Sequence, residues 1–384
     1  MSREVVHIIY MPRICFVILC WLLCCIRVSG GISEIIVFGD SLSDMGNVNE
    51  ATFGLVPSND YFKSRVFSNG APWISTLASE LGVAEPRHSL SGSSRATNYA
   101  YGGAQTGDGD SSFASILIPD VGGQIEAFET DGGMFERQSL CALWIGGNDL
   151  NGTSASNARR VINITIANLE DHIEKIIELG AVQIVIPNVP LLGEVPQHNS
   201  NSAERQQQNE LVSDYNATLA DLIADLRVRY PEIRLIEVDV EGFMMELLAD
   251  PEAFGITNVK DQAYTPGPLG DIFGGSVVDN PDGYAFWDDL HPTGPIHEIV
   301  GMLAAREVQR PPVNPVPEIR FAGPDTIIRF DSLGWATYQV ERSFDLKEWL
   351  PLGQKFFGNG DSIDVTDQGA GDFPTAFYRL TMEW

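Results

Sequence analysis

The sequence alternates short apolar runs with longer amphipathic stretches, and this alternation limits the possible folds more than any other feature. The strand-like apolar runs cover residues 34–39, 140–147, 181–190 and 233–240. The stretches with helical spacing cover residues 71–82, 158–180, 201–231 and 294–310. Strands that alternate with helices pair in parallel and are covered on both faces. We therefore expect an α/β fold over residues 31–309, a flavodoxin-like three-layer α/β/α sandwich with four or five strands.

Two of the apolar runs end in small or polar residues that are typical of a functional site. Residues 39–41 are Gly-Asp-Ser, and residues 146–148 are Gly-Gly-Asn. Right-handed connections bring the C-terminal ends of parallel strands to one edge of the sheet, so Ser41 and Asn148 should emerge together. A serine in this place is also a common helix N-cap, and an asparagine is a common turn residue. Neither segment by itself defines a site.

A nucleophilic serine needs a base, and an acid that orients the base. The histidines beyond residue 30 are His88, His172, His198, His291 and His297. His172 and His198 lie among charged or polar residues, where we expect exposed side chains. His291 differs, because Asp288 precedes it by three residues and a proline follows it. A carboxylate at that spacing reaches Nδ1 across one turn and leaves Nε2 free as a base. The alternative for His291 is an ordinary loop histidine.

Hydrolysis of an acyl group also needs hydrogen-bond donors at the developing oxyanion. The side chain of Asn148 is one candidate. Residues 98–107, NYAYGGAQTG, contain Gly102 and Gly103, whose backbone N–H groups are not shielded by side chains. Each of these features alone is also compatible with a turn or a flexible loop. Their occurrence in one chain favours acyl transfer.

With these segments in this order, the chain resembles the GDSL esterases and lipases, also called SGNH hydrolases. The resemblance covers residues 32–308 and rests on four segments: FGDSLSD, NYAYGG, GGND and DDLH. It implies that Ser41 is the nucleophile and that Asp288 and His291 complete a catalytic triad. It also implies an oxyanion hole formed by the Ser41 N–H, the Asn148 side chain and a glycine N–H. Gly102 matches the family's glycine better than Gly103, and the choice between them stays open.

The function implied by this resemblance is hydrolysis of carboxylic esters of small molecules or lipids through an acyl-enzyme, with no cofactor and no metal. An acetylesterase acting on polysaccharide and an inactive binding protein on the same fold are the alternatives. A Rossmann-type nucleotide enzyme would carry Gly-x-Gly-x-x-Gly after the first strand, which is missing here. The aspartates of residues 107–112 lack the ligand spacing of a calcium loop. We expect a pocket for short or medium acyl chains, built by loops 51–70 and 255–285.

The N-terminus has the pattern of a secretory signal peptide over residues 1–30. Arg3 and Arg13 precede an apolar run at residues 14–26, and small residues follow at 28–30. The run is shorter than the roughly 17–25 residues that a membrane-spanning helix needs, so we expect a secreted or periplasmic protein.

The formal net charge is −28, which disfavours nucleic acid and anionic membranes as partners. Cys141 is the only cysteine after the leader, and we expect it to be buried.

The composition changes at residues 310–317, where prolines predict a stiff linker. Residues 318–384 then read as short strands with turns, typical of a small β-sandwich. Contact with a glycan or a surface is one role open to this module, and a plain spacer is another.

Overall fold

The computed structural model describes short strands at residues 5–6, 24–25 and 27–28, and then residues 32–58, 65–92, 96–109, 117–267, 275–310, 315, 317–333, 336–358, 361–370, 373 and 375–383. It divides into two compact units. The larger contains residues 32–227 and 235–309, and the smaller contains the described residues of 1–31, 228–234 and 310–384. Most of the expected leader and most of the expected linker lie outside the described residues, so both stay predictions.

The larger unit is built on a four-stranded sheet. Its strands, in order across the sheet, are β4 (Glu34–Gly39), β5 (Ser139–Trp144), β6 (Gln183–Pro187) and β7 (Arg234–Val238). β4 pairs in parallel with β5, and β5 with β6. Every residue of β5 and β6 is buried, including Cys141, as expected for strands covered on both faces.

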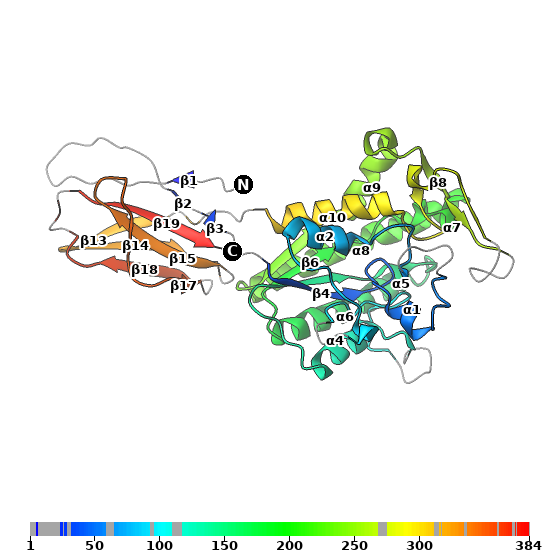
Figure 1. The fold of residues 1–384 in the computed structure, drawn as a ribbon, viewed down its shortest axis with the longest axis horizontal. Coiled ribbons are helices and arrows are strands. Elements are labelled where there is room, and N and C mark those ends of the chain that lie inside the picture. Colours follow the sequence, from blue (N-terminus) through cyan, green and yellow to red (C-terminus); the bar gives the residue numbers. More distant parts are fainter. Residues whose placement is uncertain are drawn as a thin grey trace. The chain divides into compact units, whose positions relative to one another are not determined.

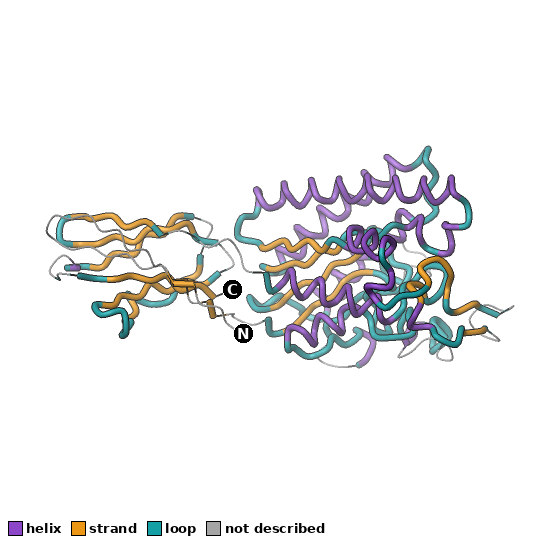
Figure 2. The backbone as a smooth tube through the Cα atoms, turned by 90° about the horizontal axis from the view of Figure 1, so that it is seen from above, coloured by secondary structure: helices purple, strands orange, loops and turns teal. Residues whose placement is uncertain are grey.

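Helices cover both faces of this sheet (Figures 1 and 2). One face carries α2 (Trp73–Leu81) and α10 (Gly294–Val308), and the other carries α4 (Val121–Thr130) and α6 (Ala158–Glu178). The alternating side chains of β4 divide between the faces. Ile35 and Val37 belong to the core that includes α2 and α10, whereas the ring of Phe38 packs edge-on against Phe128 of α4. The expected three-layer sandwich is confirmed.

The structure contains a helix that we did not predict. We expected a strand over residues 233–240, but β7 ends at Val238 and helix α9 (Val240–Ala249) begins two residues later. The Asp239 carboxylate accepts the backbone N–H of Gly242 at 2.8 Å and so caps the helix. The buried residues of α9 are Val240, Phe243, Met244 and Leu247. Their spacing of three, one and three residues is helical and could have revealed the helix.

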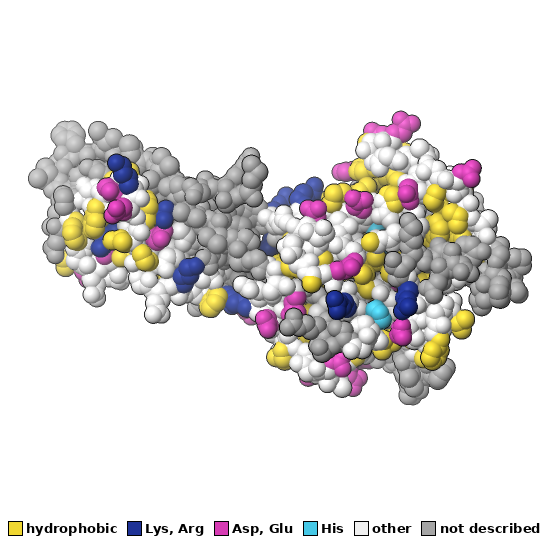
Figure 3. Space-filling view, in the orientation of Figure 1, with side chains coloured by type: hydrophobic (Ala, Val, Ile, Leu, Met, Phe, Trp, Pro, Cys, Tyr) yellow, Lys and Arg dark blue, Asp and Glu magenta, His cyan; other side chains and the backbone are white. Residues whose placement is uncertain are grey.

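The remaining elements of the larger unit are short, apart from one long helix. They are α1 (Asn47–Ala51), η2 (Ser89–Ser91), α5 (Gly147–Leu150), η3 (Leu192–Glu194), α7 (Pro196–Asn199), α8 (Ser202–Arg229), η4 (Pro251–Phe254), β8 (Asn258–Gln262), β9 (Tyr264–Thr265), β11 (Ser276–Val277), η5 (Pro281–Gly283) and β12 (Tyr284–Phe286). Among the described residues, no helix combines the length and the apolar character needed to cross a bilayer. Acidic side chains are spread over the face of the larger unit seen in Figure 3.

In the smaller unit, the strands of residues 318–384 pair with one another antiparallel, as expected. One sheet contains β13 (Glu318–Ala322), β14 (Asp325–Asp331) and β18 (Ser362–Asp367), and the other contains β15 (Thr337–Ser343), β16 (Leu350–Pro351), β17 (Phe356–Phe357) and β19 (Phe377–Glu383). Phe330, Tyr338 and Leu380 from both sheets share one apolar core. β1 (Val5–Val6) pairs with β2 (Cys24–Cys25), and β3 (Arg27–Val28) pairs in parallel with β19.

Candidate active site

Ser41 lies in a tight turn at the carboxyl end of β4. The carbonyl oxygen of Asp40 accepts the backbone N–H of Ser43 at 3.0 Å, which closes the turn. Gly39 precedes it with a φ of 150°, and a Cβ at this position would overlap the carbonyl oxygen of Trp144 in the neighbouring strand. Only glycine allows the two strands to stay this close where the chain leaves the sheet. The turn therefore presents the Ser41 hydroxyl at the sheet edge.

His291 and Asp288 come from the segment between β12 and α10, and the structure brings both to Ser41. The Nε2 of His291 lies 2.8 Å from the Oγ of Ser41, and its Nδ1 lies 2.8 Å from an oxygen of Asp288. The second oxygen of Asp288 accepts the backbone N–H groups of Leu290 and His291, at 2.9 and 2.6 Å. These bonds hold the carboxylate in a single orientation. Asp288, rather than Asp289, is the carboxylate bonded to the imidazole.

The charges of this pair stabilise each other. Burial lowers the pKa of His291 and raises the pKa of Asp288, but other interactions together outweigh burial. The attraction and hydrogen bond within the pair act on both groups, Asp40 and Asp289 add to the effect on His291, and two backbone N–H groups add to the effect on Asp288. The pKa of His291 is therefore raised above its ordinary value, and the pKa of Asp288 is lowered. The ring of Phe67 lies against the imidazole, with 5.2 Å between the ring centroids. The arrangement is suited to an imidazole that becomes positively charged when it accepts a proton.

Two of the expected oxyanion donors lie at the same end of the site. Asn148 lines the same pocket as Ser41 and His291. One N–H of its side-chain amide donates to the carbonyl oxygen of Ala104 at 2.8 Å and so orients the amide. The second N–H of the amide is not used in this hydrogen bond. In the described part of the chain, the backbone N–H of Ser41 has no acceptor. Both groups therefore have a hydrogen available for a substrate oxygen.

The N–H of Gly102, one of the two glycines considered as the third donor, is used elsewhere in this structure. The N–H of Gly102 donates to the buried carboxylate of Asp44 at 2.9 Å, so it is already engaged. A Cβ at Gly102 would overlap the ring of Phe67, so close packing against this ring accounts for a glycine at this position. Gly103 has a φ of 85°, and among the described residues its N–H has no acceptor. The adjacent residue, Ala104, holds the amide of Asn148.

Two carboxylates near the nucleophile were missed by sequence reasoning, the buried Asp40 and the partly buried Asp149. Asp40 is 3% exposed, and burial raises its pKa to about 7. Burial also raises the pKa of Asp149 to about 6, although this carboxylate accepts the N–H and hydroxyl of Thr106. The negative charge of Asp40 helps to raise the pKa of His291. The position of Asp40 directly before Ser41 could have drawn attention to it.

Two histidines that we expected to be exposed are buried. The Nε2 of His172 lies 2.8 Å from the carbonyl oxygen of Thr106, and the imidazole of His198 lies between Glu204 and Asn151, at 2.7 and 2.6 Å. Charged neighbours in sequence do not show which face of a helix packs inward, so this expectation was wrong. Within the described residues, no group of three His, Cys, Asp or Glu side chains could hold a metal ion. Residues 110–112 of the acidic loop lie outside this range.

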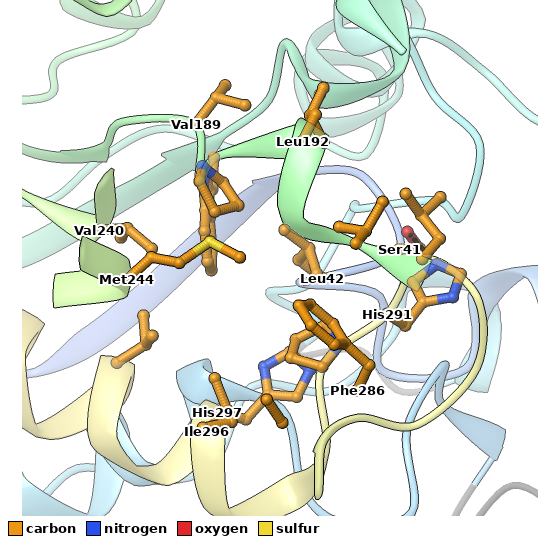
Figure 4. A pocket seen from close by; sticks show the side chains of 18 of the residues that line it. Ser41, Leu42, Val189, Leu192, Val240, Met244, Phe286, His291, Ile296 and His297 are labelled. Atoms are coloured by element: carbon orange, nitrogen blue, oxygen red, sulfur yellow. Dashed lines mark hydrogen bonds between the residues drawn. The ribbon is translucent and has the colours of Figure 1, made fainter. Parts of the chain in front are cut away.

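A cavity of about 80 Å³ opens beside Ser41 (Figure 4). We expected loops 51–70 and 255–285 to build the substrate pocket. Of the described residues in those loops, Ala285 alone lines this cavity, and residues 59–64 and 268–274 lie outside the description. The walls come from α9, the start of α10 and the segment after β6, so the expectation was wrong for this cavity.

Comparison with known proteins identifies the family of this chain. The family model of the GDSL-like lipase/acylhydrolases matches residues 35–304. A phosphatidylcholine-sterol acyltransferase of Aeromonas hydrophila is 24% identical over 322 residues, which cover 72% of this chain and 90% of the relative. A GDSL esterase/lipase of Arabidopsis thaliana is 24% identical over 331 residues, with 72% and 82% covered. The solved acetylxylan esterase Axe2 of Geobacillus stearothermophilus aligns with a TM-score of 0.36 and 15% identity, over 74% of this chain and 96% of that one.

Proposed function

Because the chain belongs to the GDSL-like lipase/acylhydrolase family and is a carboxylic ester hydrolase, we propose that it cleaves esters through an acyl-enzyme formed on Ser41. The observation that carries this proposal is the hydrogen-bonded series Ser41, His291 and Asp288, with 2.8 Å at each contact of the imidazole. A nucleophile, a base and an orienting acid within hydrogen-bond reach are what covalent ester hydrolysis requires.

In the first half of the reaction, the Nε2 of His291 accepts the hydroxyl proton as the Oγ of Ser41 attacks the ester carbonyl. The carbonyl oxygen becomes an oxyanion and is stabilised by the Ser41 N–H and the second amide N–H of Asn148. His291 then gives its proton to the leaving alcohol as the C–O bond breaks. The acyl group stays on Ser41 as an ester.

In the second half, His291 accepts a proton from a water molecule that attacks this ester. The same donors stabilise the second oxyanion, and the proton returns to the Oγ of Ser41 as the carboxylic acid departs. Asp288 keeps the imidazole proton on Nδ1 and stabilises the imidazolium in both halves. Its two backbone hydrogen bonds support this role, because they prevent the carboxylate from rotating away.

The third oxyanion donor in this proposal is the N–H of Gly103. Its unengaged N–H and its position beside Ala104, which holds the Asn148 amide, support this choice. Gly102 is less suitable because its N–H is bonded to Asp44.

A fluorophosphonate probe tests the nucleophile directly. The probe should label the purified protein at one site, and mass spectrometry should identify that site as Ser41. Ser41→Ala should remove both the label and the hydrolysis of p-nitrophenyl esters, whereas Ser156→Ala, which changes an exposed serine, should retain both. Labelling that persists in Ser41→Ala, or that maps to another serine, would refute the acyl-enzyme proposal.

We further propose that residues 1–30 direct export to a secreted or periplasmic location. Arg3, Arg13, the apolar run that follows and the small residues at 28–30 support this proposal. N-terminal sequencing of protein recovered from the medium or periplasm of a producing cell should begin near residue 31. Retention of the full N-terminus inside the cell would refute the proposal.

A further inference from the structure

The cavity beside Ser41 is lined mainly by apolar side chains. Ser41 and His291 lie at one end of it, and Val240 and Met244 lie across the cavity from them (Figure 4). The thioether of Met244 extends from α9 toward the interior. The apolar lining includes Val189, Leu192, Val240, Phe243, Met244 and Phe286.

An apolar cavity beside the nucleophile suits the acyl part of an ester better than the alcohol part. The acyl group stays bonded to Ser41 between the two halves of the reaction, whereas the alcohol must leave and a water molecule must take its place. A chain that is buried against apolar side chains is retained during this exchange by its removal from water. The closed end formed by α9 therefore matches the end of an acyl chain.

The inner wall of the cavity carries little charge. His297, at 2% exposed, is the polar side chain that lines the cavity away from Ser41. Its Nδ1 accepts the backbone N–H of Trp73 at 3.3 Å, and burial together with the nearby His291 lowers its pKa to about 3, so it is neutral at neutral pH. Asp40 lines the cavity beside Ser41, and burial raises its pKa to about 7, so this side chain offers no positive partner to a carboxylate. A charged acyl group would lose its hydration here without gaining a partner.

The size of the cavity sets a range of chain lengths. Its volume of about 80 Å³ is roughly half that of an apolar protein cavity that holds one benzene molecule. Met244 closes the far end with a flexible, unbranched side chain, which adapts to chains of slightly different length. The volume exceeds what an acetyl group needs and falls short of a long fatty acyl chain.

We propose that this cavity is the acyl-binding site and that the enzyme prefers esters of uncharged aliphatic acids with about four to six carbons, with Met244 setting the upper limit of length. The proposal rests on the proposed function, because it places the acyl group on Ser41.

A series of p-nitrophenyl esters from acetate to dodecanoate tests this proposal through kcat/KM. The wild-type maximum should fall at four to six carbons and exceed acetate by about ten-fold or more. Met244→Trp should fill the closed end and lower kcat/KM for butyrate and hexanoate by about ten-fold, while acetate changes less than about three-fold. Met245→Trp is the matched control, because Met245 is the next residue of α9 and is 53% exposed, so its profile should equal that of the wild type.

Two further measurements keep the proposal falsifiable. Met244→Ala should move the optimum toward longer chains, which tests the same wall if Met244→Trp does not fold. The p-nitrophenyl hemiester of succinic acid has four acyl carbons and a carboxylate, and it should react about ten-fold or more slowly than the butyrate. A wild-type optimum at acetate, or profiles unchanged in both Met244 variants, would overturn the acyl site while Ser41 labelling by fluorophosphonate stands. Loss of that labelling would instead refute the proposed function.

Discussion

The Nε2 of His291 lies 2.8 Å from the Oγ of Ser41, although 250 residues separate the two in the chain. Ser41 lies just after β4, and His291 lies in the segment just before α10. The contact exists because the end of β4 and the start of α10 meet at one edge of the sheet.

Ser41→Ala should lower kcat by about 10⁴-fold or more, because it removes the hydroxyl that attacks the ester while leaving the turn intact. The far-UV circular dichroism spectrum and Tm should match those of the wild type. Steady-state hydrolysis of p-nitrophenyl butyrate measures the effect. A variant that retains more than about a hundredth of the activity would contradict the assignment.

Asp288→Asn should lower kcat by about 10² to 10⁴-fold, because an amide cannot hold the imidazole proton on Nδ1 or stabilise the imidazolium. Asp289→Asn is the matched control, since the neighbouring carboxylate is not bonded to the Nδ1 of His291. Its kcat should stay within about three-fold of the wild type. A larger loss from Asp289→Asn than from Asp288→Asn would show that the wrong carboxylate has been chosen.

The pH dependence of kcat/KM should report His291. Only the neutral imidazole accepts a proton, so activity should fall on the acidic side with a midpoint above 6.5, because Asp288 raises the pKa of His291. In Asp288→Asn this attraction is lost and burial remains, which lowers the pKa, so the acidic midpoint should move to lower pH. Residual activity of the variant measured between pH 4 and 9 tests the shift. An unchanged midpoint would mean that another group controls the profile.

Asn148→Ala should lower kcat by about 10² to 10³-fold with little change in KM, because it removes one donor to the oxyanion. The variant also loses the hydrogen bond to Ala104, so Tm must be measured beside the rate. Asn151→Ala, at the C-terminal boundary of the same short helix, is a useful comparison, since Asn151 bonds to His198 and Gln197 instead. If Asn148→Ala lowers Tm and spares kcat, the residue is structural.

Asp40→Asn should change how stability depends on pH. Burial raises the pKa of Asp40 from its ordinary value of 3.8 to about 7, so the folded state holds the proton more tightly than the unfolded state. The stability that this group contributes is fully present below pH 3.8 and is lost as the pH rises through about 7. The variant cannot titrate at this position, so its free energy of unfolding should fall less between pH 5 and pH 8 than that of the wild type. Urea titrations at the two pH values measure this difference, and equal declines would contradict it.

Much of the site could be predicted from local sequence. Asp288 and His291 are three residues apart, so the chain itself keeps the carboxylate within reach of the imidazole. Ser41 and Asn148 each follow an apolar strand, and parallel strands place such residues at a common edge whatever the details of packing. The helices of residues 71–82, 158–180, 201–231 and 294–310 were visible in the spacing of their apolar side chains.

Other parts depended on contacts between distant segments. The sequence left the choice between Gly102 and Gly103 open, and the hydrogen bond that the Gly102 N–H donates to Asp44 distinguishes their N–H groups. The burial of His172 and His198 likewise follows from Thr106 and from Glu204 and Asn151, rather than from the residues beside them in sequence. The spacing of apolar residues identifies a helix, but it does not show which polar side chains of that helix are buried and hydrogen-bonded.

The sequence by itself determined the α/β layers and the chemistry at the sheet edge, because periodicity and short-range spacing act within a few residues of the chain. Only the tertiary structure decided the shape of the cavity beside Ser41. Its walls combine residues 189–195, 240–247 and 285–300, which meet through packing. The volume left between them depends on how closely those side chains fill space, and that close packing is a property of the folded interior as a whole.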